Sequence, residues 1–316
     1  MNGTMVWPAT AAICEVGLRD GLQNEKKLLS VEEKLELLDS IVASGVKIIE
    51  IGSFVHPKAV PQMADTGELA KRMKRAEGVE YRVLVPNLKG LERAYDAGLT
   101  KAKLTVSVSE SHCRANFNQT PLQMMEGFGP CVEFAAKNGM VISGALSSAW
   151  GCAWEGKIPT AQIEKITRAF LDLGITELSL SDATGMASPR HIYEMGSHLK
   201  KAFPEVSWVL HLHNTRGMAL ACAVAALQVG ITTFDGAFAG FGGCNFIPGA
   251  AGNVSTEDLI HMLHEMDIDT GVDLAKAMET GRLAQRILGR AGGSYVLQAG
   301  RNCDLVAQKA QAQQNK

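Results

Sequence analysis

The sequence lacks any apolar run of the roughly 18 residues that a membrane-spanning helix needs. Its first ten residues, MNGTMVWPAT, have neither a basic start nor an apolar core, so we expect no secretory signal peptide. The formal net charge is only −2, so the sequence lacks the excess of positive charge that favours nucleic acid or an anionic membrane surface. We therefore expect a cytoplasmic protein whose partners include neither nucleic acid nor a membrane.

Cysteine is present, but without a pattern that indicates a disulfide framework or a structural zinc site. The count of seven is odd, and no two cysteines form a C-x-x-C pair. Reduced thiols are the simpler interpretation. The seven are Cys14, Cys113, Cys131, Cys152, Cys222, Cys244 and Cys303.

Apolar residues are abundant, at 46% of the 316 residues, which is enough for a large core. Eight short runs rich in β-branched residues alternate with longer segments of helical periodicity. This alternation predicts a parallel sheet, and eight strands can close into a (β/α)8 barrel. The runs are residues 11–17, 46–53, 80–86, 101–109, 139–147, 175–182, 207–213 and 231–238.

We expect this α/β TIM barrel to be a single domain over residues 1–316, because no linker, repeat or low-complexity block divides the chain. The barrel would occupy about residues 11–260. Further helices would follow over about 256–290, with a polar tail after them.

Three helix starts are predicted by their first residues. Ser30 with Glu33 has the spacing of a capping box, and Pro189 stands where a helix can begin. Ser255 with Asp258 has the pattern of a further helix start.

Polar residues collect where the predicted strands end, which is where barrel enzymes carry their chemistry. Loop polarity or helix capping would explain one or two of them, but explains the whole set poorly. They are Arg19, Asp20, Glu50, Ser53, Asn87, Lys89, Ser109, Glu110, Ser147, Asp182, His211 and His213.

The segment HLHN ends the seventh run. Alternate residues of a strand face one side, so His211 and His213 project together, either as metal ligands or as ordinary hydrogen-bonding residues. Asp20 would add a carboxylate oxygen, or would instead form a salt bridge, and Asn253 could supply another oxygen. Such a mixed oxygen and nitrogen set suits Mg²⁺ or Mn²⁺, with Zn²⁺ as an alternative.

A glycine-rich segment follows the eighth run. Gly240, Gly242 and Gly243 precede Cys244 and predict a mobile or tightly turned loop. The segment lacks the G-x-x-x-x-G-K-[ST] pattern of a phosphate-binding loop. Cys244 could be a nucleophile, an acid or a small apolar filler.

Five segments carry a family resemblance: EVGLRDGLQNE, IEIGSFVHPKAVPQMADT, VPNLKG, HLHN and GFGGCNFIPGAAGNVSTEDL. Together they resemble the 3-hydroxy-3-methylglutaryl-CoA lyases, within the metal-dependent barrel family of acyl-CoA lyases, aldolases and condensing synthases. The similarity runs from about Cys14 to about Leu288, in the order that the family shows.

The resemblance implies a divalent-metal site, no organic cofactor and an acyl-CoA substrate. It also implies that Glu50 and Asp182 support the metal ligands and that Cys244 lies on a loop that closes over the substrate. The implied metal ligands are Asp20, His211, His213 and Asn253.

The implied reaction breaks the bond between the hydroxyl-bearing carbon and the carbon next to the thioester. Arg19 would stabilise the resulting enolate oxygen. Asp20 or His211 would remove the hydroxyl proton, and Cys244, or a water that it positions, would protonate the enolate carbon. The catalytic residues are then Arg19, Asp20, Glu50, His211 and Cys244, and the substrate contacts are Arg19, Gln23, Ser53, Asn87, Ser147, Asp182, Gly242 and Gly243.

Five positions depart from the family's usual residues. Ala145 stands in place of a tyrosine, Ala183 of a threonine, Asn214 of an aspartate, and both Leu18 and Asn245 of a proline. The metal set is complete, so the departures put the acyl group in doubt rather than the reaction class. A substrate with a bulkier substituent is one interpretation, and neutral divergence is the other.

Two further alternatives stay open. A condensing synthase would run the reverse, Claisen-type reaction, but such relatives usually carry a C-terminal regulatory extension. A catalytically inactive scaffold would not need Arg19 and a full ligand set, which are present. Whichever of these activities applies, we expect the protein to form a homodimer or a larger homo-oligomer.

Overall fold

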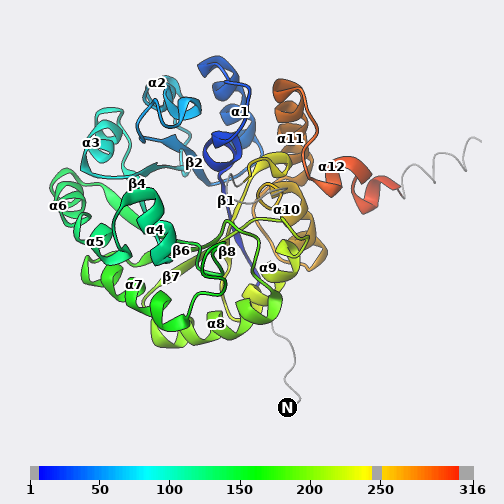
Figure 1. Cartoon of the computed structure of the whole chain (residues 1–316). Coiled ribbons are helices and arrows are strands. Elements are labelled where there is room, and N and C mark those ends of the chain that lie inside the picture. Colours follow the sequence, from blue (N-terminus) through cyan, green and yellow to red (C-terminus); the bar gives the residue numbers. More distant parts are fainter. Residues whose placement is uncertain (1–6, 244–250, 306–316) are drawn as a thin grey trace, which may run out of the picture.

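The strands form a closed ring in the order of the sequence. In a computed structural model that describes residues 7–243 and 251–305, eight parallel strands close into a barrel (Figure 1). β1 pairs with both β2 and β8, and Ile13 of β1 lies opposite Phe234 of β8. The predicted eight-stranded barrel is therefore confirmed. The strands are β1 Ala12–Glu15, β2 Ile48–Ser53, β3 Glu80–Val85, β4 Lys101–Ser107, β5 Val141–Ser147, β6 Glu177–Asp182, β7 Ser207–Leu212 and β8 Thr233–Gly236.

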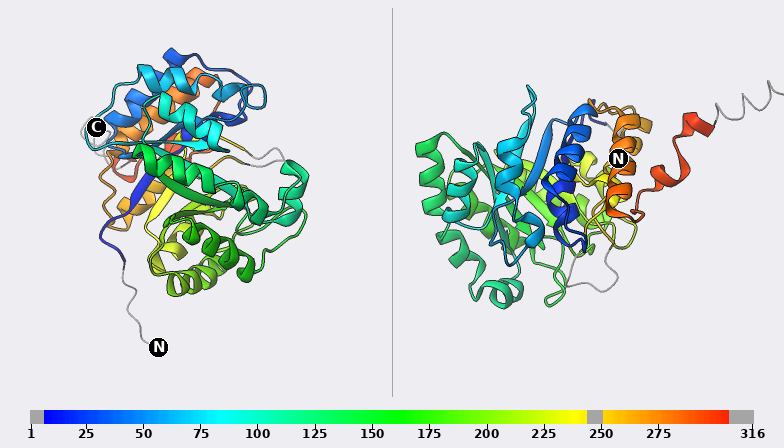
Figure 2. Two further views of the ribbon diagram at one scale, coloured as in Figure 1. Left: turned by 90° about the vertical axis from the view of Figure 1, so that its left-hand side faces the viewer. Right: turned by 90° about the horizontal axis from the view of Figure 1, so that it is seen from above.

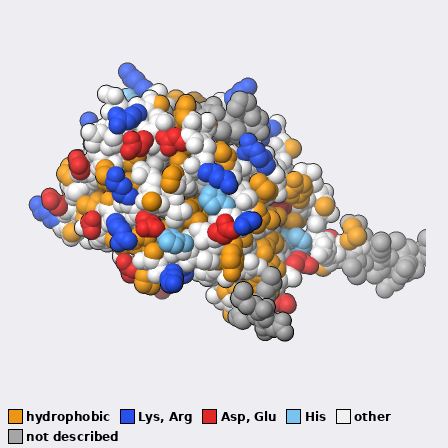
Figure 3. All heavy atoms as spheres, turned by 60° about the horizontal axis from the view of Figure 1, so that its bottom comes forward, with side chains coloured by type: hydrophobic (Ala, Val, Ile, Leu, Met, Phe, Trp, Pro, Cys, Tyr) orange, Lys and Arg blue, Asp and Glu red, His pale blue; other side chains and the backbone are white. Residues whose placement is uncertain are grey.

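Helices surround the barrel on all sides (Figures 1 and 2). No helix of the described residues is long and apolar enough to cross a membrane. On the face shown in Figure 3, basic and acidic side chains are interspersed. The helices are α1 Val31–Ala43, α2 Thr66–Arg72, α3 Leu88–Asp96, α4 Glu110–Phe117, α5 Pro121–Glu126, α6 Gly129–Asn138, α7 Thr160–Asp172, α8 Pro189–Ala202, α9 Ala219–Gln228, α10 Thr256–Glu265, α11 Leu274–Leu288 and α12 Tyr295–Ala299, with short turns η1 Gly17–Gly21, η2 Pro61–Met63 and η3 Phe238–Gly240.

The helix starts predicted from local sequence are confirmed. The Ser30 side chain accepts a hydrogen bond from the Glu33 N–H, and the Glu33 carboxylate accepts one from the Ser30 N–H. Pro189 is the first residue of α8. At α10 the Ser255 hydroxyl accepts from the Asp258 N–H at 3.2 Å.

One helix lies where we expected a polar tail. Ser294 caps α12, and its hydroxyl donates to the Asp258 carboxylate at 2.9 Å. The same carboxylate accepts from the N–H groups of Tyr295 at 2.9 Å and Val296 at 2.8 Å. Asp258, which lies 36 residues before Ser294, thus accepts hydrogen bonds from backbone donors that the first turn of α12 leaves free. A local sequence pattern cannot show so distant a partner. Residues 306–316, the rest of the predicted tail, lie outside the described residues.

Alternation along the strands divides the barrel into an apolar outside and a polar inside. Leu104, Leu146, Leu180 and Leu210 are fully buried core residues in β4 to β7. Their sequence neighbours point the other way, toward the barrel axis. The interior of such a barrel is usually filled by branched apolar side chains. Here small and polar residues take those positions, so the axis is hollow at its C-terminal half. These residues are Lys103, Thr105, Ser107, Ala145, Ser147, Ser179, Ser181 and His211.

A group of ion pairs closes the opposite end of the barrel. Lys101 in β4 contacts Glu80 of β3 at 3.0 Å and also Glu177 of β6, and Arg82 of β3 contacts Glu177 at 2.8 Å. These residues lie at or near the N-terminal ends of their strands and do not line the cavity at the C-terminal end. Lys101 and Arg82 are buried, so each depends on its carboxylate partners to offset the cost of desolvation.

Replacing Lys101 by Met should destabilise the protein without altering the hollow end of the barrel. We expect the free energy of unfolding, measured in urea, to fall by about 2–4 kcal/mol, because the two carboxylates lose a buried partner. The control is Arg190→Met, which removes an exposed ion pair with Glu194 on α8 and should change the same quantity by at most about 0.5 kcal/mol. Equal effects of the two substitutions would contradict this assignment.

Candidate active site

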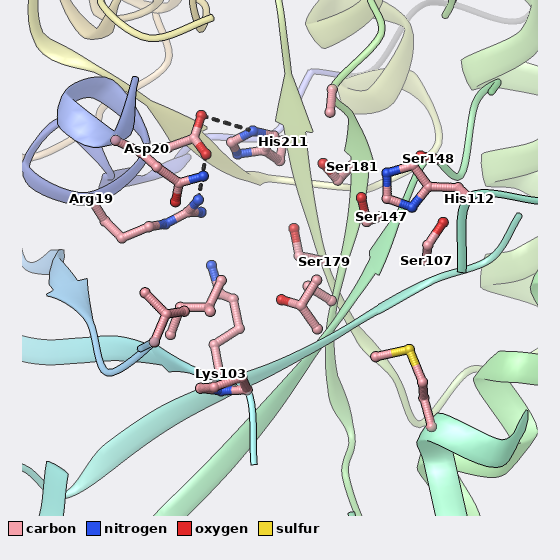
Figure 4. A pocket seen from close by; sticks show the side chains of 18 of the residues that line it. Arg19, Asp20, Lys103, Ser107, His112, Ser147, Ser148, Ser179, Ser181 and His211 are labelled. Carbon is pink, nitrogen blue, oxygen red and sulfur yellow. Dashed lines mark hydrogen bonds and ion pairs between the residues drawn. The ribbon is translucent and has the colours of Figure 1, made fainter. Parts of the chain in front are cut away.

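The hollow end of the barrel is a cavity of about 870 Å³. It lies at the C-terminal ends of the strands, the position of active sites in barrels of this type. Figure 4 shows Arg19, Asp20 and His211 on one side of it and the serines of β4 to β6 on the other. The cavity is large enough for an organic ligand of moderate size.

One turn of π-helix, η1, places two charged residues at the rim. The N–H groups of Asp20 and Gly21 both donate to the carbonyl oxygen of Val16, at 2.8 and 3.3 Å. Such turns are rare and are found disproportionately at functional sites. This turn directs Arg19 and Asp20 into the cavity, where their side chains also form an ion pair with each other.

The four residues expected as metal ligands converge. The Asp20 Oδ2 atom lies 3.3 Å from His213 Nε2 and 3.8 Å from His211 Nε2. Asp20, His211 and His213 each have a possible ligand atom within 4.8 Å of those of the other two. The Asn253 amide nitrogen donates to Asp20 Oδ2 at 2.8 Å. Among the described residues the buried Asn253 Oδ1 has no hydrogen-bond partner.

This donor set fits a divalent cation. A carboxylate oxygen and two imidazole nitrogens, with an amide oxygen that still lacks a partner, suit Mg²⁺, Mn²⁺ or Zn²⁺. Burial alone would raise the pKa of Asp20, but Arg19 and the two histidines outweigh it and hold this pKa well below the usual range. The carboxylate is therefore ionised at neutral pH, as a ligand must be.

A chain of ion pairs extends from these residues into the barrel. Glu50, fully buried in β2, accepts from the Arg19 Nε–H through one carboxylate oxygen. Its other oxygen lies 2.6 Å from the Lys103 ammonium, which is 3.6 Å from the Asp235 carboxylate. Asp235 in turn lies 3.1 Å from His211 Nδ1. The Asp235 carboxylate in this position fixes the imidazole ring of His211, so that Nε2 of this ring points to Asp20.

Lys103 and Asp235 were not among the residues predicted from the sequence. Burial would raise the pKa of Asp235, but Lys103 and His211 outweigh it and lower this pKa. The signal for both residues was present, because each is a charged residue inside an apolar strand segment. The prediction considered only the ends of the strands and so missed them.

The structure separates the expected substrate contacts into two groups. Gln23, Asn87, Ser147 and Gly243 line the cavity together with Arg19. The lining does not include Ser53, Asp182 or Gly242, and neither does it include Glu50. Cys244 and Asn245 lie outside the described residues.

Asp182, Ser53 and Gly242 lie away from the cavity wall. The Asp182 carboxylate accepts from the N–H groups of Met186 and Ala187, both at 2.9 Å, and so shapes the loop after β6. Ser53 is fully buried in β2. Gly242 has a φ of 114° and packs against the side chain of Asn253.

The unusual residues of the sequence also differ in their placement. Ala145 and Ala183 line the cavity. The Asn214 side chain accepts a hydrogen bond from the N–H of Ala219, the first residue of α9, at 3.2 Å. Leu18 is buried in the core. Of the four departing positions that the structure describes, only the two alanines line the cavity.

Gly242→Ala should weaken metal binding. A Cβ at this position would lie 2.5 Å from the Asn253 amide nitrogen, and its φ is unfavourable for alanine. We expect the Mn²⁺ dissociation constant, measured by EPR, to rise by about 10-fold. The control is Gly243→Ala, whose Cβ would meet no described atom within 4 Å, and which should keep the constant within about twofold. Unchanged Mn²⁺ binding in Gly242→Ala would count against Asn253 as a ligand.

Comparison with known proteins supports the assignment suggested by the motifs. A hydroxymethylglutaryl-CoA lyase from Bacillus subtilis is 40% identical over 294 residues, which covers 93% of this chain and 98% of that protein. A cytoplasmic 3-hydroxy-3-methylglutaryl-CoA lyase from Danio rerio is 41% identical, covering 93% of this chain and 88% of the relative.

Solved structures agree with the sequence relatives. An HMG-CoA lyase from Acinetobacter baumannii, determined in complex with coenzyme A and 3-methylmalate, superimposes with a TM-score of 0.89 at 38% identity, covering 94% of this chain and 97% of that one. The family model described as HMGL-like matches residues 10–284. The resemblance predicted from five short segments is confirmed, and the chain belongs to the HMGL-like family.

Proposed function

We propose that the protein is a divalent-metal-dependent carbon–carbon lyase that cleaves 3-hydroxy-3-methylglutaryl-CoA to acetyl-CoA and acetoacetate. The observation that carries the proposal is the convergence of Asp20, His211 and His213 beside Arg19 at the wall of a large cavity. The names of the relatives support the same substrate. A divalent ion held by Asp20, His213 and Asn253, with His211 beside it, would supply Lewis acidity, lowering the pKa of the substrate hydroxyl.

The reaction is a retro-aldol cleavage, also described as a retro-Claisen cleavage because the enolate is that of a thioester. The hydroxyl loses its proton, the bond from the carbinol carbon to the carbon next to the thioester breaks, and the bonding electron pair moves onto that carbon and the thioester oxygen. Arg19 is the group that stabilises the resulting enolate. Its guanidinium has five N–H donors, of which the contacts to Asp20 and Glu50 use two. A preorganised donor of this kind typically contributes about 100-fold to 1000-fold to the rate.

His211 is the better of the two candidate bases. The low pKa of Asp20 makes it a weak proton acceptor, whereas Asp235 contacts His211 Nδ1 and would stabilise its protonated ring. In this role His211 would accept the proton at Nε2, and the metal would rest on Asp20, His213 and Asn253. We propose that Cys244, or a water that it positions, then protonates the enolate carbon.

A related substrate with a bulkier substituent on the carbinol carbon is the second candidate. Its support is Ala145, a small side chain on the cavity wall where relatives of the lyase type usually carry a tyrosine. The homodimer or larger homo-oligomer and the cytoplasmic location stay predictions.

Turnover of purified protein on 3-hydroxy-3-methylglutaryl-CoA tests the principal proposal. With Mg²⁺ or Mn²⁺ we expect acetyl-CoA and acetoacetate in equal amounts, and no turnover after chelation with EDTA. His211→Ala should lower kcat by about 1000-fold, because the proposed base is lost. The control is His264→Ala, which removes a hydrogen bond between the last turn of α10 and Thr270, away from the cavity lining, and should leave kcat unchanged. No metal-dependent product from the folded protein would overturn the proposal.

Substitution of Ala145 tests the substrate alternative. If the space beside Ala145 receives a bulky substituent, the wild type should cleave 3-hydroxy-3-propylglutaryl-CoA with a kcat/KM within about 10-fold of that for the methyl compound. Ala145→Tyr should then lower kcat/KM for the propyl compound by about 10-fold to 200-fold and leave the methyl compound within about threefold. Equal losses on both compounds would show that this side chain does not set the substituent size.

A further inference from the structure

Lys103 is an unusual residue for the interior of a barrel. It lies in the middle of β4, its side chain points to the axis, and it is only 2% exposed. Lysine is almost never buried to this degree without charged partners, and barrel interiors are normally apolar. Its presence therefore needs a reason in what it contacts.

Its two partners come from other strands of the barrel and reach it across the barrel interior. The ammonium lies 2.6 Å from Glu50 Oε2 and 3.6 Å from Asp235 Oδ2. Glu50 belongs to β2 and Asp235 to β8, the two strands that flank β1. A lysine ammonium is a compact charge on a flexible stem, so it can stand between two carboxylates that do not share a plane.

Each of these carboxylates holds one residue of the proposed reaction. Glu50 binds the Nε–H of Arg19 through its other oxygen, and Asp235 faces Nδ1 of His211. The enolate-stabilising group and the proposed base are thus joined through a single side chain that neither of them touches.

We propose that Lys103 is a positioning residue that fixes Arg19 and His211 relative to one another by holding Glu50 and Asp235 together. The inference rests on the proposed function for the roles of Arg19 and His211. It adds a residue whose ion pairs are to Glu50 and Asp235 and to none of the proposed metal ligands.

Removing the ammonium leaves two buried carboxylates without the charge between them. Like charges in a low-dielectric interior repel, so at least one of the two carboxylates moves away. A displaced Glu50 releases the Arg19 guanidinium, and a displaced Asp235 releases the His211 ring. Both effects act on the alignment for reaction more than on the affinity for substrate.

The test compares Lys103→Met with Lys101→Met. Lys101 lies two residues earlier on the same strand and is also a buried lysine with two carboxylate partners, but at the opposite end of the barrel. Three quantities are measured on the full chain: kcat and KM on 3-hydroxy-3-methylglutaryl-CoA, the Mn²⁺ dissociation constant without substrate, and the free energy of unfolding. If Lys103→Met does not fold, Lys103→Gln replaces it, because its amide can still donate to Glu50 while the charge is absent.

We expect Lys103→Met to lower kcat by about 100-fold, to keep KM within about threefold, and to raise the Mn²⁺ dissociation constant by about 10-fold. Lys103→Arg, which restores the charge, should recover at least 10-fold of the lost kcat. Lys101→Met should lose stability while keeping kcat and Mn²⁺ binding within about twofold.

Three results would overturn the proposal. Wild-type kcat and Mn²⁺ binding in Lys103→Met would show that the bridge is not needed. Equal losses in Lys101→Met would show a general effect of buried charge. A rise confined to KM would show that Lys103 contacts the substrate directly. If the wild type does not cleave the compound, the proposed function fails, and the Mn²⁺ constants of the two variants still decide the role of Lys103.

Discussion

Buried charge at the barrel axis is tolerated only where an opposite charge lies against it, and the site depends on this constraint. Arg19 and Lys103 supply two positive charges against the carboxylates of Asp20, Glu50 and Asp235. One negative charge therefore remains unbalanced beside two imidazoles. A bound cation would neutralise it, so the charge pattern that makes the interior stable also prepares it for a metal.

The strands accommodate both a stable core and a reactive interior because successive side chains along each strand point to opposite faces. In β4 to β7 the outward positions are largely apolar, as at Leu104, Leu146 and Leu210, while the inward positions that face the cavity are small or polar. The apolar contacts that hold the barrel together are therefore separate from the residues that face the cavity. Changes at the inward positions can alter the chemistry while the outer layer keeps the fold.

Much of this structure could be predicted from the sequence, because short local patterns determine where its strands and helices begin and end. Apolar runs located all eight strands, and caps such as Ser30 located helix starts. What was missed depends on contacts distant in sequence: α12 begins where Asp258 binds it, and the inward direction of Lys103 depends on its register in the sheet. The family resemblance implied Asp182 as a substrate contact, and sequence could not show that its carboxylate accepts from the N–H groups of Met186 and Ala187.

The contacts of Asn253 have a thermodynamic consequence. Its amide group donates both to Asp20 Oδ2 and to the carbonyl oxygen of Phe241, and Gly242 packs against it. The backbone at Phe241 and Gly242 and the ion-binding residues therefore share one side chain. Any ligand that shifts this backbone changes the affinity for the ion, and reciprocity requires the ion to change the affinity for that ligand by the same factor. Metal concentration and substrate concentration would then act on this enzyme as linked variables.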